Sequence, residues 1–149
     1  MCGIFGIVTN QTISIGNVAL EGIKRLEYRG YDSCGIVSQH NSKLIVKKDS
    51  GKIDEIQKRI DLTEFPYGSF LALAHTRWAT HGPPTKENSH PHLDCSGEIA
   101  VVHNGIIDNF MELRDELISK GHTLKSDTDT DLLYPAPFRH KGQWSFPAY

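Results

Sequence analysis

Apolar residues come in short, separated runs along the chain, and their spacing predicts strands and helices in alternation. Residues 2–8 (CGIFGIV) are almost all apolar, which is typical of a buried strand. Residues 12–27 have a helical spacing instead, ending before Gly30, with the apolar positions at Ile15, Val18, Ala19, Ile23 and Leu26. Residues 52–62 repeat this spacing at Ile53, Ile56 and Ile60. The first part of the chain is therefore expected to contain a strand and two helices.

The remaining pattern predicts four more strands and one more helix. Residues 34–39 and 43–48 flank the polar His40-Asn41-Ser42, as in a β-hairpin. Residues 70–75 (FLALAH) and 98–103 (EIAVVH) look like buried strands, joined by a polar loop with prolines at positions 83, 84 and 91. Asp108 is a candidate N-cap for a helix that carries Phe110, Leu113 and Leu117 and ends at Gly121.

Composition narrows the class of protein. The chain has 149 residues, 38% hydrophobic and 23% charged, which suits one globular domain. Its net charge of -2 gives no electrostatic reason to bind nucleic acid or an anionic membrane. No apolar run approaches the roughly 20 residues of a membrane span, and no basic residue precedes the first apolar run. Three widely spaced cysteines disfavour a disulfide framework. A soluble cytoplasmic protein is expected.

Cys2 is the first candidate for chemistry. A small residue after Met1 favours removal of the initiator methionine, which would leave Cys2 with both a thiol and a free α-amine. Reference pKa values of about 8.5 for a thiol and about 7.7–8.0 for an α-amine suit a nucleophile and a base near neutral pH. The alternative is that Cys2 is a small buried hydrophobic residue, which is the more frequent role for a cysteine at this position considered alone.

Three polar segments follow predicted strands or precede a predicted helix. In residues 75–82, Arg77 is suited to grip a carboxylate through paired hydrogen bonds, or else forms a surface ion pair. Asn104 and the N–H of Gly105 are suited to an oxyanion hole, or else form an ordinary turn. The aspartates of residues 126–131 are suited to bind an ammonium group, or else cap a helix.

A metal site is a further alternative. Five histidines and a cysteine lie close together in the sequence: His75, His81, His90, His92, His103 and Cys95. None of them has a standard zinc-ligand spacing such as HExxH or CxxC. No metal is therefore expected, and a small metal-binding module is kept as a minor hypothesis.

Taken together, several motifs resemble one family. They are CGIFG at 2–6, LEYRGYDSCGI at 26–36, AHTRWATHG at 74–82, HPH at 90–92, VVHNGII at 101–107 and SDTDTD at 126–131. The chain from residue 2 to residue 133 is similar to the N-terminal glutaminase domain of the glutamine–fructose-6-phosphate aminotransferases, a class II glutamine amidotransferase. This resemblance implies an α+β fold, the N-terminal-nucleophile hydrolase sandwich, in which two antiparallel sheets lie between helical layers (αββα).

The resemblance also implies roles for individual residues. Cys2 would attack the side-chain amide of L-glutamine, and Asn104 with Gly105 would stabilise the oxyanion. Arg77 would hold the substrate α-carboxylate and Asp129 its α-ammonium. The other implied pocket residues are Trp78, Thr80, His81 and, near the nucleophile, Arg29. No cofactor is implied, and ammonia would pass to a sugar-phosphate isomerase domain that this chain lacks.

The family pattern stops near residue 133. Residues 134–149 are rich in proline and aromatic side chains and match no motif of the family, as in a truncated or alternatively decoded C-terminus. A sandwich that lacks its later strands would leave sheet edges unpaired, so weak or absent glutaminase activity is expected. The alternative function is that of a non-catalytic truncated product of the same gene family, which either associates with full-length subunits or is degraded.

Overall fold

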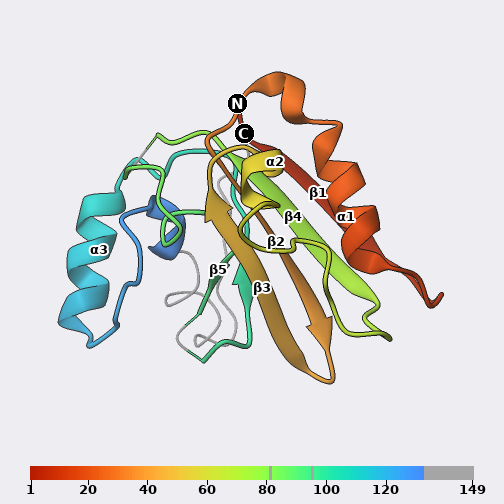
Figure 1. Cartoon of the computed structure of the whole chain (residues 1–149). Helices are drawn as coiled ribbons and strands as arrows, with labels where there is room; N and C mark the ends of the chain where they lie inside the picture. Colours follow the sequence, from red (N-terminus) through yellow and green to blue (C-terminus); the bar gives the residue numbers. More distant parts are fainter. Residues whose placement is uncertain (81, 95, 133–149) are drawn as a thin grey trace, which may run out of the picture.

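The fold is built around an antiparallel sheet with two helices packed on one face and a third helix, α3 (Phe110–Ser119), away from the sheet (Figure 1). The computed structural model describes residues 1–80, 82–94 and 96–132. Within them the main sheet has four strands in the order β1-β4-β2-β3. These strands are β1 (Gly3–Val8), β2 (Ser33–His40), β3 (Lys43–Ser50) and β4 (Leu71–Arg77). A two-stranded sheet pairs β5 (His92–Leu93) with β6 (Ala100–Val101). The helices are α1 (Ile15–Lys24), α2 (Ile53–Ile56) and α3 (Phe110–Ser119), with 3-10 turns at Glu27–Arg29 and Asp129–Leu132.

One face of the main sheet forms the hydrophobic core. Alternate residues of the strands point to this face, and small side chains at Ala72 and Ala74 of β4 let α1 approach closely. Ile23 of α1 and Ile36 of β2 are fully buried there, which stabilises each by roughly 1.5–3 kcal/mol relative to an exposed side chain. Figure 1 shows α1 running beside β1 and β4, with α2 over the end of β2 and β3.

The opposite face of the sheet is polar where β4 ends. His75 and Arg77 of β4 alternate with the core residues and are buried on this second face. The segment that leads into β5 lies directly against it: a Cβ atom at Gly35 of β2 would come within 2.2 Å of the His90 carbonyl oxygen. Glycine at this position therefore allows the segment to pack on the sheet and to cover the polar groups.

Most of the strands and helices expected from the sequence are confirmed. β1, β2, β3 and β4 lie within one or two residues of the predicted ranges, and α1 occupies the middle of the predicted helix. The hairpin turns at Asn41 and Ser42, whose φ angles are 48° and 62°. Gly121 follows α3 with a φ of 84°, as expected of a glycine that ends a helix.

Several details of the sequence prediction are wrong. Val18 is 36% exposed, because α1 turns Leu20 rather than Val18 toward the sheet. The helix expected at 52–62 is regular only over Ile53–Ile56, and Ile60 reaches the core from the turns that follow. A hydrophobic side chain recurring every third or fourth residue fits successive turns as well as a helix, so periodicity alone overestimated its length.

The second half of the chain departs further from the prediction. The strand expected at 98–103 is only Ala100–Val101, and its partner β5 lies within the stretch predicted as a loop. Asp108 does not cap α3; Asn109 precedes the helix, and no side chain caps its first N–H groups. The predicted boundary after residue 133 and the tail at 134–149 lie outside the described residues. No helix among the described residues has the length and hydropathy needed to span a membrane.

Candidate active site

The pairing of β1 with β4 brings the start of the chain close to the loop that follows β4. Gly3 of β1 pairs with Thr76, so Cys2 lies just beyond the paired region. The Trp78 N–H donates a hydrogen bond to the Cys2 Sγ atom over 3.2 Å. Cys2 is half-buried and its thiol is free, as is that of Cys34. The sulfur therefore contacts polar main chain at the edge of the sheet rather than the hydrophobic core.

The amino terminus is held by main-chain carbonyl groups. The Met1 ammonium donates to the carbonyl oxygens of Arg29 and Gly30 over 2.9 and 3.2 Å. Arg29, expected near the nucleophile, thus approaches it through its carbonyl group, while its exposed side chain donates from Nε to the Tyr28 hydroxyl over 3.2 Å. In this structure the amine belongs to Met1, and the Cys2 nitrogen is part of a peptide bond.

The motif at 26–33 builds the frame around these carbonyl groups. Gly30 has a φ of 72°, and a Cβ atom there would lie 3.1 Å from the Trp78 ring. Tyr31 is buried: its hydroxyl donates to Glu27 and accepts the Ile53 N–H over 2.8 Å. Burial and the neighbouring Glu27 raise the pKa of Tyr31. The motif therefore fixes the turn that holds the amino terminus and supports Trp78.

Arg77 places a buried positive charge at the carboxyl end of β4. Its side chain is 4% exposed and donates to the Gly82 carbonyl over 3.2 Å. Burial lowers the pKa of Arg77, and the nearby Asp32, Cys2 and Asp129 act in the opposite direction. The thiol and the Asp129 carboxylate thus lie within electrostatic range of one guanidinium group.

Asp32 is a further residue of the site that the sequence analysis missed. Its Oδ2 atom accepts the Ala79 N–H over 2.7 Å, and its N–H donates to the Arg77 carbonyl over 2.8 Å. Asp32 therefore holds the main chain on both sides of Trp78. Its position inside the 26–33 motif was the only signal in the sequence.

Asn104 and Gly105 follow β6 in an exposed loop. The Asn104 Oδ1 atom lies 2.8 Å from Nε2 of His75, which is fully buried. A Cβ atom at Gly105 would come within 2.7 Å of the His103 ring, so glycine lets the loop fold over that ring. The contact between Asn104 and His75 was not foreseen, because the two residues are 29 positions apart.

Asp129 connects the last described segment to the same loop. It is 4% exposed, and its Oδ2 atom accepts the Ile107 N–H over 2.8 Å. Asp131, the final aspartate of the 126–131 motif, is fully buried and accepts the N–H groups of Lys125 and Ser126 over 2.6 and 2.9 Å. Hydrogen bonds within the segment therefore hold the motif in place, and the Asp129 carboxylate contacts the loop that contains Asn104.

The other predicted pocket residues lie after β4. The Trp78 side chain is 53% exposed, and Thr80 is exposed two residues later. His81 lies outside the described residues. Of the predicted set, the structure thus links Cys2 to Trp78 by a hydrogen bond and to Arg77 by charge.

Three buried histidines form an edge-to-face stack behind the loop that carries Asn104. The rings of His75 and His90 are 4.3 Å apart between centroids, and those of His90 and His92 are 4.6 Å apart. Burial lowers the pKa of His75 to about 4, although Asn104 and the His103 main chain act in the opposite direction. Burial also lowers the pKa of His92 to about 3 and that of His90 further still. All three are therefore neutral at pH 7.

The histidines do not assemble into a metal site in the part of the chain that the structure describes. No group of three or more His, Cys, Asp or Glu side chains there could hold a metal ion. His81 and Cys95, which belong to the metal-binding hypothesis, are outside that part. The stacked rings contact each other and hydroxyl or amide groups instead, as in the 3.0 Å contact between His92 Nε2 and Thr128 Oγ1.

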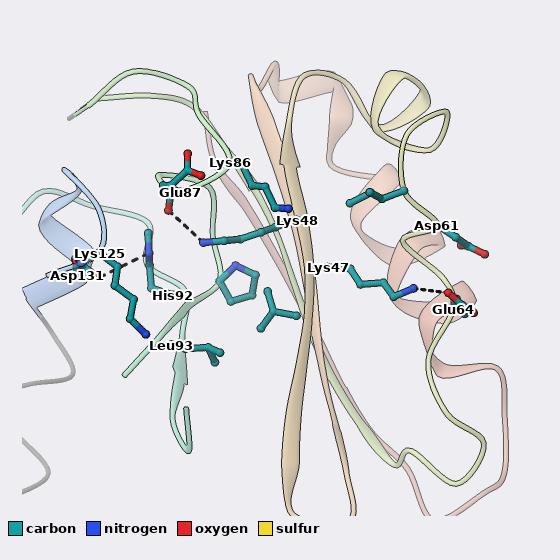
Figure 2. Close-up of a pocket in the computed structure, with 13 residues that line it drawn as sticks. Lys47, Lys48, Asp61, Glu64, Lys86, Glu87, His92, Leu93, Lys125 and Asp131 are labelled. Carbon is teal, nitrogen blue, oxygen red and sulfur yellow. Dashed lines mark hydrogen bonds and ion pairs between the residues drawn. The ribbon is translucent and has the colours of Figure 1, made fainter. Parts of the chain in front are cut away.

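A separate cavity of about 630 Å³ lies between β3 and the region of β5 (Figure 2). Its walls include Lys47, which is paired with Glu64 over 2.9 Å, and Lys48, whose pKa is lowered to about 8 by burial. Cys2, Arg77, Asn104 and Asp129 are not among its lining residues. Since a reaction needs its nucleophile, the candidate active site is the Cys2 cluster and not this cavity.

Comparison with solved structures defines the class of fold. The B. subtilis glutamine phosphoribosylpyrophosphate amidotransferase, complexed with ADP and GMP, is similar with a TM-score of 0.76 and 26% identity over 97% of this chain and 30% of that one. An allosteric regulatory enzyme of purine biosynthesis is similar with a TM-score of 0.73 and 29% identity over 89% of this chain and 28% of that one. The predicted α+β, N-terminal-nucleophile amidotransferase fold is confirmed.

The family follows from sequence comparison. A family model described as "Glutamine amidotransferase domain" matches residues 54–144, and the chain belongs to this family. Within it, the chain is 52% identical over 133 residues to a glutamine–fructose-6-phosphate aminotransferase (isomerizing) of Pyrococcus horikoshii, and 53% identical to that of Methanothermobacter thermautotrophicus. Each alignment covers 89% of the chain but only 22% of the relative. The resemblance to the glutaminase domain of these enzymes is confirmed, and the chain spans about a fifth of their length.

Proposed function

We propose that this chain is the glutaminase portion of a glutamine–fructose-6-phosphate aminotransferase and hydrolyses L-glutamine at Cys2. One observation carries the proposal. The Cys2 sulfur accepts the Trp78 N–H over 3.2 Å at the end of β4, where the buried guanidinium of Arg77 is within electrostatic range of both Cys2 and Asp129. A nucleophile in the field of one positive and one negative group is suited to an amino acid, whose carboxylate and ammonium need opposite charges.

Substrate binding follows from these charges. Arg77 binds the α-carboxylate of glutamine, where a guanidinium offers parallel N–H donors, and Asp129 binds the α-ammonium. Trp78, Thr80 and His81 form the wall beside the substrate. This arrangement directs the side-chain amide of glutamine toward Cys2.

Removal of Met1 makes the nucleophile complete. The carbonyl groups of Arg29 and Gly30 accept hydrogen bonds from the Met1 ammonium in this structure. After removal of Met1, the neutral amine of Cys2 donates its N–H groups to such acceptors and keeps its lone pair for a proton. The amine takes the proton of the thiol, and the Sγ atom attacks the amide carbon of glutamine. Asn104 and the Gly105 N–H stabilise the oxyanion; loss of one such donor typically costs about 2.7–4 kcal/mol.

The reaction then runs through a thioester. The C–N bond of the tetrahedral intermediate breaks, and the amine of Cys2 returns its proton to the departing nitrogen, so that ammonia leaves. Water hydrolyses the γ-glutamyl thioester, giving glutamate and the free thiol. The similar relatives are isomerizing aminotransferases, so the ammonia is destined for fructose 6-phosphate in a domain beyond this chain, in the cytoplasm.

The experiment that tests the proposal measures glutamate release from glutamine by the full 149-residue chain. Mass spectrometry first establishes that Met1 is absent. We expect weak activity that is abolished in Cys2→Ala and retained in Cys34→Ala, the matched control, because Cys34 is only 1% exposed in the core. A processed chain that releases no glutamate contradicts the proposal and favours the non-catalytic alternative, as does retention of Met1.

A further inference from the structure

The Asn104 side chain is anchored by a buried group rather than by its own loop. Asn104 is exposed, yet its Oδ1 atom lies 2.8 Å from Nε2 of His75, a fully buried residue of β4. An exposed asparagine on a loop usually samples several rotamers, whereas a contact to the rigid centre of a sheet selects one. The orientation of this amide is therefore set by β4.

The structure places the Oδ1 atom of Asn104, rather than its amide nitrogen, toward His75. A carboxamide oxygen only accepts hydrogen bonds, so in this arrangement His75 carries its single proton on Nε2. His90 Nδ1, 3.2 Å from the same Nε2 atom, then presents a lone pair, and the proton of His90 is on its buried Nε2 atom. With Oδ1 turned to His75, both N–H donors of Asn104 point away from the histidine stack. The reverse orientation would present an oxygen to the reaction, which repels an oxyanion.

His75 and Arg77 lie two residues apart in β4 and on the same face of the sheet. Their spacing along the strand is about 7 Å. Arg77 interacts with Cys2 and Asp129, and Asp129 accepts an N–H of the loop that carries Asn104. One short stretch of β4 therefore places both the charge that binds substrate and the anchor of Asn104.

We propose that His75 is a positioning residue for glutamine hydrolysis: its Nε2–H holds the Asn104 carboxamide oxygen and turns the amide N–H groups toward the oxyanion formed at Cys2. This inference rests on the proposed function for the role of Asn104, but not for the orientation of the amide. His75 itself touches neither the substrate nor the sulfur in this scheme.

Steady-state kinetics of the full, Met1-processed chain test the role of His75. In His75→Phe we expect kcat to fall about 10- to 100-fold while KM changes less than about threefold, because the oxyanion forms only in the transition state. His75→Gln, whose side-chain amide can still donate to Asn104, should recover kcat to within about threefold of the parent. A loss of kcat in His75→Gln as large as in His75→Phe overturns the proposal.

The matched control is His40→Phe, which removes a histidine at the hairpin end of β2. His40 contacts Asn41 of the turn rather than Asn104, so its replacement should leave kcat within about twofold. Asn104→Ala provides a second check. If His75 acts through Asn104, His75→Phe should lower kcat no further in the Asn104→Ala background; additive losses contradict the proposal.

Nuclear magnetic resonance tests the orientation without any catalysis. In the parent chain at pH 7, long-range correlations of the ring nitrogens of His75, assigned through His75→Gln, should show the proton on Nε2. A proton on Nδ1 overturns the proposal. A chain with the proton on Nε2 that releases no glutamate supports the orientation of Asn104 and refutes the proposed function instead, so the two failures are distinguishable.

Discussion

Gly30 connects the turn at Glu27–Arg29 to β2 and has a backbone conformation that suits only glycine. Its φ is 72° with a ψ of 143°, and the Trp78 ring covers the position where a Cβ atom would be. Its carbonyl oxygen also accepts a hydrogen bond from the amino terminus. A single glycine therefore affects the turn, the indole and the amine of the proposed site together.

Gly30→Ala should destabilise the chain by about 2–3 kcal/mol, because a positive φ is strained in an L-residue and the new methyl group presses on Trp78. Gly68→Ala is the matched control: its φ is also positive at 83°, but nothing lies within 4 Å of the added Cβ. That variant should lose only about 1 kcal/mol. Urea unfolding measures both, and equal losses would show that the Trp78 contact contributes nothing.

At this scale the sequence predicted site residues but not how they are held. Cys2, Arg77 and Asp129 were chosen from their motifs, and in the structure Cys2 and Asp129 lie within electrostatic range of Arg77. The supporting contacts join distant positions, such as Asp32 to Ala79 and His75 to Asn104. A side-chain hydrogen bond between residues so far apart depends on strand pairing, so local sequence does not reveal it.

The β2–β3 hairpin is the element whose prediction succeeded most fully. Polar His40-Asn41-Ser42 between two apolar runs indicated a turn, and all eight residues of β2 pair with β3. The turn residues Asn41 and Ser42 both have positive φ. This is typical of type I′ turns, whose backbone twist matches the twist of the two strands that they join in a two-residue hairpin. Asparagine tolerates this conformation, but serine at the second position is strained.

Ser42→Gly should therefore stabilise the chain by about 0.5–1 kcal/mol, since relief of the left-handed strain exceeds the extra entropy of an unfolded glycine. Ser42→Val should destabilise it by at least about 1 kcal/mol, because a β-branched residue fits this conformation poorly. Thermal unfolding followed by circular dichroism compares the two variants. A lower melting temperature for Ser42→Gly than for the parent would show that the turn is not strained.

Other elements were harder to predict because they are short. β5 and β6 have two residues each, too few to show an alternation. They are recognised as strands only through their pairing with each other, in which His92 lies opposite Val101. The expected cap at Asp108 failed for a related reason: a capping residue is defined by where the helix begins, and α3 begins one residue later than the pattern indicated.

For the whole molecule, the buried histidines make stability depend on pH. The pKa of His75 is lowered to about 4 and that of His92 to about 3, whereas histidine in an unfolded chain has a pKa of about 6.5. Between these values the unfolded chain binds more protons than the folded one. The free energy of unfolding is then constant above about pH 6.5 and falls as the pH decreases toward 4.

At pH 5 each of these histidines should lower the free energy of unfolding by about 2 kcal/mol relative to pH 7. Urea unfolding at pH 7, 6 and 5 measures this loss before carboxylates with ordinary pKa values begin to titrate. His92→Phe removes one of the titrating groups and should show a shallower loss than the parent. The same free energy of unfolding at pH 7 and pH 5 would mean that the stack is not buried as described.

The sequence by itself determined the family, the α+β class, the main strands with their hairpin, and the residues most suited to chemistry. These depend on local periodicity and on motifs that are contiguous in the chain. Only the tertiary structure decided that Cys2 meets Trp78, that Arg77 is within electrostatic range of both the thiol and Asp129, and that a buried histidine contacts Asn104. The reason is physical: antiparallel pairing and the packing of loops onto the second face of the sheet join residues that no spacing rule connects.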